Sequence, residues 1–276
     1  MISKGTPLGR FASHAVLLVG ALTMFFPLVW MFLLSISDNP PGGATLGELF
    51  SKAFTLSNYT DALASDNFDI YFLNSLLVAT IVSVANCLLC TIVAYAFARR
   101  DFPMKKLWFG TVLAILMVPP HVVMIPLYRE MVVFGWINTY AALMIPFFVT
   151  PFGVFLMKQY IEELPKELEE AATIDGATTS HILRGIIFPL AKPMLVVLFM
   201  YQFLSMWNSF LFPFLFVSDA SMRTLPVGLA FYQGKQSIDM GHLMAGAGMS
   251  ALPVLVLFAI FQKKIIAGLT AGAVKG

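Results

Sequence analysis

Long apolar runs without Asp, Glu, Lys or Arg alternate with shorter polar segments along this chain. These charge-free runs cover residues 11–37, 71–98, 107–128, 139–157, 193–217 and 242–262. A bilayer core about 30 Å thick is crossed by about 20 residues of helix, and backbone polar groups inside it must pair within that helix. The pattern therefore predicts an all-α integral membrane protein with about six transmembrane helices.

Prolines interrupt several of these runs, including Pro119 and Pro120 in the third, Pro146 in the fourth and Pro213 in the fifth. Each removes a backbone donor and favours a kink. The first run also follows basic residues, as a signal peptide would. It is too long for a typical signal sequence, and no small-x-small cleavage site precedes the polar segment after it, so we expect an uncleaved first span.

The composition agrees with a membrane location. Hydrophobic residues make up 59% and charged residues 12% of the 276 residues, and the mean hydropathy is +0.83. Soluble domains have about 45–50% apolar and about 25% charged residues, so lipid must cover the excess apolar surface. The net charge of +2 is too small to suggest a nucleic-acid partner.

The distribution of Lys and Arg predicts the orientation of the chain. Thirteen of the 17 lie in the two terminal segments and in the loops after the second and fourth runs, which share one face of the membrane. Lys and Arg concentrate on the cytoplasmic side. Both termini are therefore predicted to be cytoplasmic.

The sequence offers little that resembles catalytic or metal chemistry. Cys87 and Cys90 form a C-x-x-C pair, but their neighbours are mainly apolar, so we interpret them as small side chains on a buried helix. No metal site is predicted. The chain has no G-x-x-x-x-G-K-[ST] loop, so the sequence predicts no P-loop nucleotide site in it.

The segment 158–192 is the long polar stretch on the predicted cytoplasmic side. Glu163, Glu167 and Glu170 are spaced at i, i+4 and i+7, which predicts one face of a helix with Pro165 in its first turn. Gly176 is placed to end that helix in a positive-φ cap.

A second short helix is predicted to follow the glycine turn. Thr178, Thr179 and Ser180 are its N-cap candidates. It should end at Phe188, because the residue before Pro189 is disfavoured in the helical region. Such a hairpin could lie on lipid headgroups, but six acidic against four basic residues disfavour an anionic surface, and a basic protein partner fits better.

These residues resemble a known motif. Glu170-Ala171-Ala172, followed by Gly176, Ile186 and Phe188-Pro189, is similar to the EAA loop of ABC importer permeases, whose pattern has Leu where this chain has Phe188. With Asp175 and the segments 55–59, 207–208 and 268–276, the resemblance extends to the binding-protein-dependent carbohydrate-uptake permeases and covers nearly the whole chain.

The resemblance implies a type I ABC importer permease in the bacterial cytoplasmic (inner) membrane, with a single transmembrane domain over 1–276 and a coupling loop at 158–192. It implies three kinds of partner: a second homologous permease, two cytosolic ATPase subunits that hold ATP and Mg, and an extracytoplasmic sugar-binding protein. This chain would itself need no cofactor and would not be an enzyme. The residues implied in docking the ATPase are Glu170, Ala171, Ala172, Asp175 and Gly176.

Polar residues inside the runs are candidates for a translocation path: Asn74, Asn86, Gln202, Trp207 and Asn208. An indole ring stacks on a sugar face and amides bind hydroxyl groups. The same residue types also form interhelical hydrogen bonds in membranes. Both interpretations stay open at this point, as does the identity of the sugar or polyol.

Two other classes of protein make different demands. An ion-coupled secondary transporter of small polar solutes needs ionisable groups within its spans, and the runs contain only His14, His121 and His242, near run ends. A membrane-embedded enzyme needs an H-E-x-x-H motif or a nucleophile beside its base, and neither is found. The importer permease is therefore the preferred hypothesis and the secondary transporter the alternative.

Overall fold

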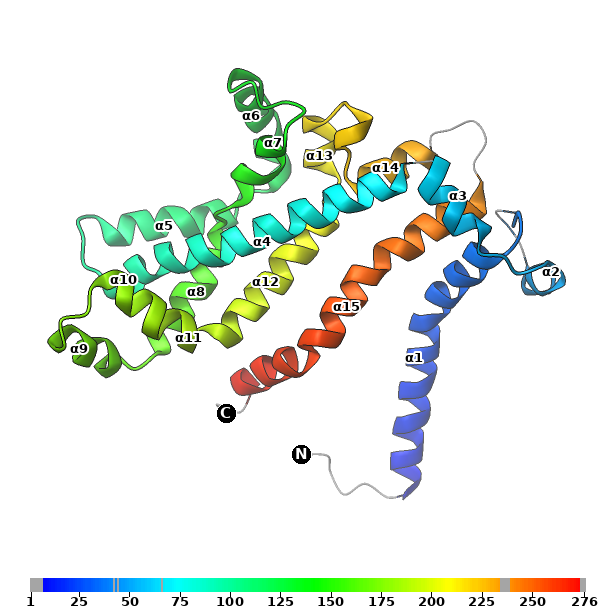
Figure 1. The fold of residues 1–276 in the computed structure, drawn as a ribbon. Coiled ribbons are helices and arrows are strands. Elements are labelled where there is room, and N and C mark those ends of the chain that lie inside the picture. The colour runs from blue at the N-terminus through cyan, green and yellow to red at the C-terminus, as the bar shows by residue number, and fades with distance from the viewer. Residues whose placement is uncertain (1–6, 42, 44, 66, 234–238, 274–276) are drawn as a thin grey trace. The chain divides into compact units, whose positions relative to one another are not determined.

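The computed structural model describes residues 7–41, 43, 45–65, 67–233 and 239–273. Three residues counted in the orientation argument, Lys4, Lys235 and Lys275, lie outside the described residues, as does the terminal part of the family resemblance, 274–276. The described chain is helical apart from one isolated β-bridge between Ser37 and Phe54. Figure 1 shows its helices. The chain divides into two compact units, Met1–Asp69 with Leu229–Leu252, and Ile70–Gly228 with Pro253–Gly276.

The first unit contains the N-terminal helix and the polar segment that follows it. Its helices are α1 (Pro7–Ile36), α2 (Leu46–Ser51), α3 (Ser57–Ser65), the end of α14 (Leu225–Gln233) and the first part of α15 (Met240–Ala273). The buried Asn58 amide donates to the carbonyls of Ser35 and Ser37 at 2.9 and 2.8 Å, which fixes α3 to the end of α1.

The second unit contains the polar segment 158–192. Its helices are α4 (Phe68–Arg99), α5 (Lys105–Leu116), α6 (Pro120–Val133), α7 (Tyr140–Met144), the 3₁₀ turn Ile145–Phe147, α8 (Pro151–Glu163), α9 (Glu167–Ile174), α10 (Thr179–Ile182), a π-helical stretch Leu183–Ile187, α11 (Phe188–Leu190), α12 (Lys192–Trp207) and α13 (Leu211–Phe216).

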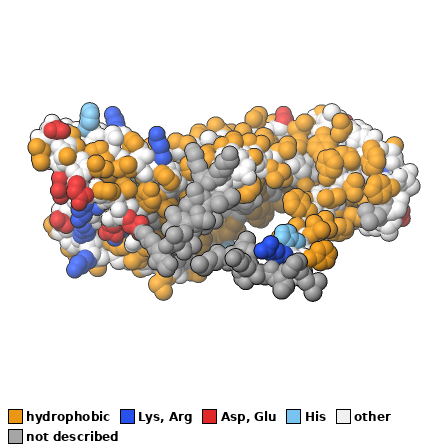
Figure 2. Space-filling model, turned by 90° about the horizontal axis from the view of Figure 1, so that it is seen from below, with side chains coloured by type: hydrophobic (Ala, Val, Ile, Leu, Met, Phe, Trp, Pro, Cys, Tyr) orange, Lys and Arg blue, Asp and Glu red, His pale blue; other side chains and the backbone are white. Residues whose placement is uncertain are grey.

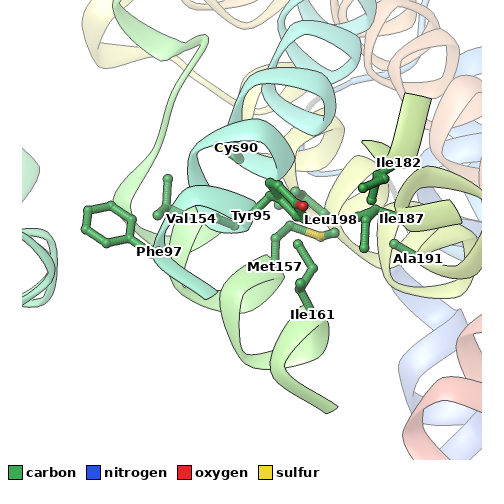
Figure 3. Close-up of a cluster of buried hydrophobic side chains, with 11 residues drawn as sticks. Cys90, Tyr95, Phe97, Val154, Met157, Ile161, Ile182, Ile187, Ala191 and Leu198 are labelled. Carbon is green, nitrogen blue, oxygen red and sulfur yellow. The ribbon is translucent and has the colours of Figure 1, made fainter. Parts of the chain in front are cut away.

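One hydrophobic core joins α4, α8, α12 and the segment between α9 and α12. Met157, Ile187 and Leu198 are at most 1% exposed, and Figure 3 shows their side chains directed toward one another. Cys90 belongs to the same core and Cys87 is half-buried, with both thiols free. Their interpretation as small side chains on a buried helix is confirmed.

The expected class, an all-helical membrane protein, is confirmed. Among the described residues four helices are long and apolar enough to cross a membrane: α1, α4, α15 and the stretch Tyr140–Glu163. Two further pairs of helices satisfy the same test but are bent, which gives up to six spans.

The third, fourth and fifth runs do not form the single helices expected of them, and the fourth is divided into α7, the 3₁₀ turn and α8. The third is split into α5 and α6, which meet at an angle of 104°, because Pro119 and Pro120 interrupt the hydrogen bonding between them. The fifth ends as a helix at Trp207 and resumes at Leu211, so the break falls at Asn208 and not at Pro213.

Candidate functional site

The polar segment predicted to be cytoplasmic leaves α8 through a short extended linker. Leu164 has ψ 143°, outside the helical region, because it precedes Pro165. The next helix, α9, therefore starts at Glu167, and Glu163 is the last residue of α8. The prediction that Glu163 and Pro165 belong to the same helix as Glu167 and Glu170 is wrong.

The turn after α9 is the one the sequence predicts. Gly176 has φ +80°, and its N–H donates to the Thr173 carbonyl at 3.0 Å. The N–H of Ala177 donates to the Ala172 carbonyl at 2.9 Å. These two bonds form a Schellman cap, which satisfies the last carbonyls of the helix and fixes the direction of the chain.

The second arm of the hairpin begins as expected and ends later than expected. The Thr178 hydroxyl accepts the His181 N–H and caps α10. The chain then stays helical past Pro189 to Leu190, so the predicted end at Phe188 is wrong. A π-helical turn lies between α10 and the proline, and in it the Phe188 N–H donates to the Leu183 carbonyl five residues back. This change in the hydrogen-bond pattern before Pro189 accommodates the proline ring in the helix.

The residues expected to dock a partner are mostly on the surface of α9 and its cap. Glu170, Ala171, Asp175 and Gly176 are exposed, whereas Ala172 is half-buried and packs against the core of its own subunit. Two apolar neighbours share the exposed surface: Ile174 is 86% and Leu168 47% exposed. The exposed side of α9 thus combines acidic and apolar side chains.

Beside this exposed surface, α9 is held to the end of α4 by an ion pair that sequence reasoning missed. Arg99, the last residue of α4, donates through Nε to Glu169 Oε1 at 2.6 Å, and through Nη2 to the Leu164 carbonyl at 2.7 Å. The two charged side chains are only 5% and 11% exposed. Removing one partner of such a buried pair costs about 3–5 kcal/mol, because the other charge stays uncompensated.

The neighbouring arginine holds the other arm. Arg100 donates through Nη2 to the Thr179 hydroxyl at 2.6 Å, and its guanidinium carbon lies 5.7 Å from the centroid of the Tyr95 ring. The only signal in the sequence for these contacts was the Arg99-Arg100 pair at the end of the second apolar run, which the positive-inside argument used for orientation alone.

A cleft of about 640 Å³ lies between the end of α4 and α9. It is lined by charged residues of these two helices, of the segments next to them and of the start of α5, among them Arg100, Lys105, Lys166, Glu169 and Glu170. Figure 2 shows acidic and basic side chains gathered where α9 and α10 lie. Within the described ranges, no group of three or more His, Cys, Asp or Glu side chains could hold a metal ion.

The first two candidate path residues, Asn74 and Asn86, are buried and bind backbone carbonyls. The Asn74 amide donates to the carbonyls of Ser221 and Arg223, and the Asn86 amide donates to the carbonyls of Phe147 and Phe148. These bonds agree with the alternative interpretation, hydrogen bonding between helices.

The remaining three path candidates differ in exposure. Gln202 is 2% and Trp207 3% exposed, and the indole of Trp207 stacks on Phe203 with ring centroids 5.8 Å apart. Asn208 is exposed, at the break between α12 and α13, and its amide donates to the Leu204 carbonyl.

Helices long enough to cross a membrane, together with a rigidly capped helical hairpin that exposes an acidic and apolar surface, define a membrane component built to contact another protein. Residues 90–270 match the family described as "Binding-protein-dependent transport system inner membrane component", and the chain belongs to this family. It is therefore a multi-pass inner membrane protein, the permease subunit of an ABC transporter, and ATPase activity resides on separate subunits. This assignment sets aside the ion-coupled secondary transporter.

Curated relatives extend over nearly the whole chain. The trehalose/maltose transport system permease protein MalG of Thermococcus litoralis is 36% identical over 271 residues, which is 95% of this chain and 96% of that protein. The arabinooligosaccharides transport system permease protein AraQ of Halalkalibacterium halodurans is 36% identical over 266 residues, 93% of each chain. A crystal structure of a bacterial ABC transporter involved in the import of the polysaccharide alginate has the same fold, with a TM-score of 0.82, 21% identity, and coverage of 95% of this chain and 98% of that chain.

Proposed function

We propose that this permease moves a sugar or a related polyol into the cell, together with a second homologous permease, two cytosolic ATPase subunits and an extracytoplasmic binding protein. The solute class is supported by the relatives, whose names specify trehalose/maltose and arabinooligosaccharides. Uptake proceeds by alternating access, in which closure of the ATPase subunits on ATP is transmitted to the membrane helices.

The observation that carries the proposal is that α9 is fixed to its own subunit and still leaves an acidic and apolar surface open. Glu169 and Ala172 fix the helix to the subunit, whereas Glu170 and Ile174 are exposed and line the cleft beside the end of α4. An isoleucine that is 86% exposed beside a carboxylate suits a partner with an apolar surface and a basic residue. A helix that is held by its own subunit and docked by a partner can transmit a movement.

For the translocation path, we propose a contribution from Asn208. It is exposed at the break between α12 and α13, and an unwound segment within a membrane span is tolerated where it lines a cavity or is covered by protein. The buried positions of Asn74, Asn86, Gln202 and Trp207 favour a packing role for them within this subunit.

The experiment compares two charge reversals in the purified transporter, reconstituted with its ATPase subunits and binding protein. Glu170→Lys should weaken the association of the ATPase, because losing one partner of a desolvated charge pair typically costs about 2–5 kcal/mol. ATP-driven sugar uptake should fall with it. The matched control is Glu162→Lys, which breaks an exposed 2.7 Å pair with Lys158 in α8 worth about 0–1 kcal/mol.

Glu170→Lys should not change insertion of the subunit into the membrane. Normal ATPase association and normal uptake by this variant would show that Glu170 has no docking role. An equal loss in Glu162→Lys would also count against it, since that residue precedes the docking surface.

A further inference from the structure

Helix α4 is suited to act as a rigid rod. It contains 32 residues without proline or glycine, the usual causes of kinks, whereas α1, α6 and α15 each contain an internal proline. At 1.5 Å per residue it is about 48 Å long, which exceeds the hydrocarbon thickness of a bilayer. A displacement at one of its ends must therefore appear at the other.

The cytoplasmic end of α4 is attached to both arms of the hairpin. Arg99 binds Glu169 on α9 and the linker carbonyl of Leu164, and Arg100 binds Thr179 at the start of α10. These contacts fix the hairpin to α4 directly beside the exposed Glu170 and Ile174, which line the same cleft.

The middle of α4 is attached to the break between α7 and α8. Asn86 donates to the carbonyls of Phe147 and Phe148 at 3.3 Å each and to the Thr150 hydroxyl at 3.2 Å. Gly153 lets α8 approach closely, because a Cβ there would lie 2.8 Å from the sulfur of Cys90. The polar groups freed by the break are thus satisfied by α4.

The far end of α4 holds the segment before α14. Asn74 donates to the carbonyls of Ser221 and Arg223 at 2.9 and 3.0 Å, and accepts from the Tyr140 hydroxyl at 2.6 Å. The Ser75 hydroxyl accepts the N–H of Leu225 at 2.7 Å. The attachments at residues 74, 86 and 99 are about 18 and about 20 Å apart along the helix.

From these contacts we propose that α4 is the element that carries movement of the cytoplasmic hairpin through the subunit, and that Arg99 and Glu169 are the positioning residues that couple the two. The proposal rests on the proposed function, since it requires a driven hairpin. It adds that the buried Arg99–Glu169 ion pair is needed for the drive to reach α4. The adjacent carboxylates then have separate tasks: Glu170 faces the partner and Glu169 faces the subunit.

The test replaces the ion pair by a covalent link. Arg99→Cys/Glu169→Cys is made in a subunit whose two native cysteines are alanine, and the complete transporter is reconstituted in vesicles. Without cross-linker, ATP hydrolysed per sugar imported should rise at least about five-fold, the lower end of coupling between allosteric sites. A short bis-maleimide that joins the two cysteines should return the ratio to within about two-fold of the cysteine-free parent.

The matched control is Lys158→Cys/Glu162→Cys, treated in the same way. It removes an ion pair of similar length, 2.7 Å, within α8, together with the contact of the Lys158 ammonium to the Phe109 ring of α5. Neither interaction joins the hairpin to α4, so the ratio should stay at the parent's value before and after cross-linking. A loss of coupling at 99 and 169 that cross-linking does not reverse would overturn the proposal, as would normal coupling in the unlinked double variant. ATP-driven sugar uptake by the cysteine-free parent tests the proposed function separately.

Discussion

Gly176 allows a quantitative test of whether the shape of the hairpin matters for transport. Its φ of +80° lies in the left-handed region, and no atom lies within 4 Å of a Cβ built there. The penalty of Gly176→Ala is therefore purely conformational, about 1–2 kcal/mol. This corresponds to a roughly 5–30-fold larger population in which the cap is open.

Gly135 is a matched control at the end of α6. It has φ +67°, free space around a Cβ, and the same pair of Schellman bonds, from Gly135 to Val132 and from Trp136 to Met131. Gly135→Ala should carry a similar conformational penalty. Because it lies outside the hairpin, it should leave coupling intact.

The assay combines limited proteolysis with transport. An endoproteinase that cuts beside aspartate should cleave at Asp175 about 5–30-fold faster in Gly176→Ala, since cleavage follows the open population when opening is fast. ATP-driven uptake should fall in Gly176→Ala and stay normal in Gly135→Ala. Gly176→Asn should recover much of the activity, because asparagine tolerates the left-handed region. Equal loss of uptake in both alanine variants would refute the reasoning, as would faster cleavage with full uptake in Gly176→Ala.

Three further predictions concern packing, path and topology. Gly228→Ala should destabilise the subunit by about 1–3 kcal/mol through overpacking, because its Cβ would lie 2.1 Å from the Tyr71 ring. The denaturation temperature in detergent should fall accordingly, and an unchanged temperature would contradict this contact. Trp207→Ala should destabilise the subunit by about 3–5 kcal/mol in the same assay. Asn208→Ala should assemble normally but import sugar poorly, and normal import by this variant would show that Asn208 does not line the path. Ser180→Cys should react with an impermeant maleimide only when the cytosolic face is accessible, and labelling from outside intact cells would reverse the predicted orientation.

The sequence sufficed wherever a feature is determined by local chemistry. The apolar runs predicted a helical membrane protein because hydrocarbon requires about 20 residues of internally bonded backbone. Gly176 predicted the C-terminal cap of one helix and Thr178 the N-cap of the next. Both could be predicted because the hydrogen bonds of a cap join groups only a few residues apart in the chain. The docking residues came from the motif around Glu170, and their role stays a prediction.

Tertiary structure decided the backbone conformation at positions where the local rules do not suffice. The rule that a residue before proline leaves the helix holds at Leu164 and fails at Phe188, although both precede proline. At Leu164, the carbonyl accepts from Arg99, and the next residues, Pro165 and Lys166, are exposed, so no buried side chain after the proline holds the chain in a helix. Before Phe188, the buried Ile187 and Ile182 hold the segment against the core, and a π-helical turn absorbs the proline.

Only the fold could separate the two adjacent glutamates. Glu169 and Glu170 are equivalent as sequence, but helical geometry turns one toward Arg99, 70 residues away along the chain, and leaves the other exposed. The same holds for Asn74 and Asn86, whose amides bind backbone segments that no spacing rule connects to them. The pairing of buried polar groups that are distant in the chain depends on which helices pack together. Hydrophobic periodicity predicts that one face of a helix is buried, but it does not predict which other helix covers that face.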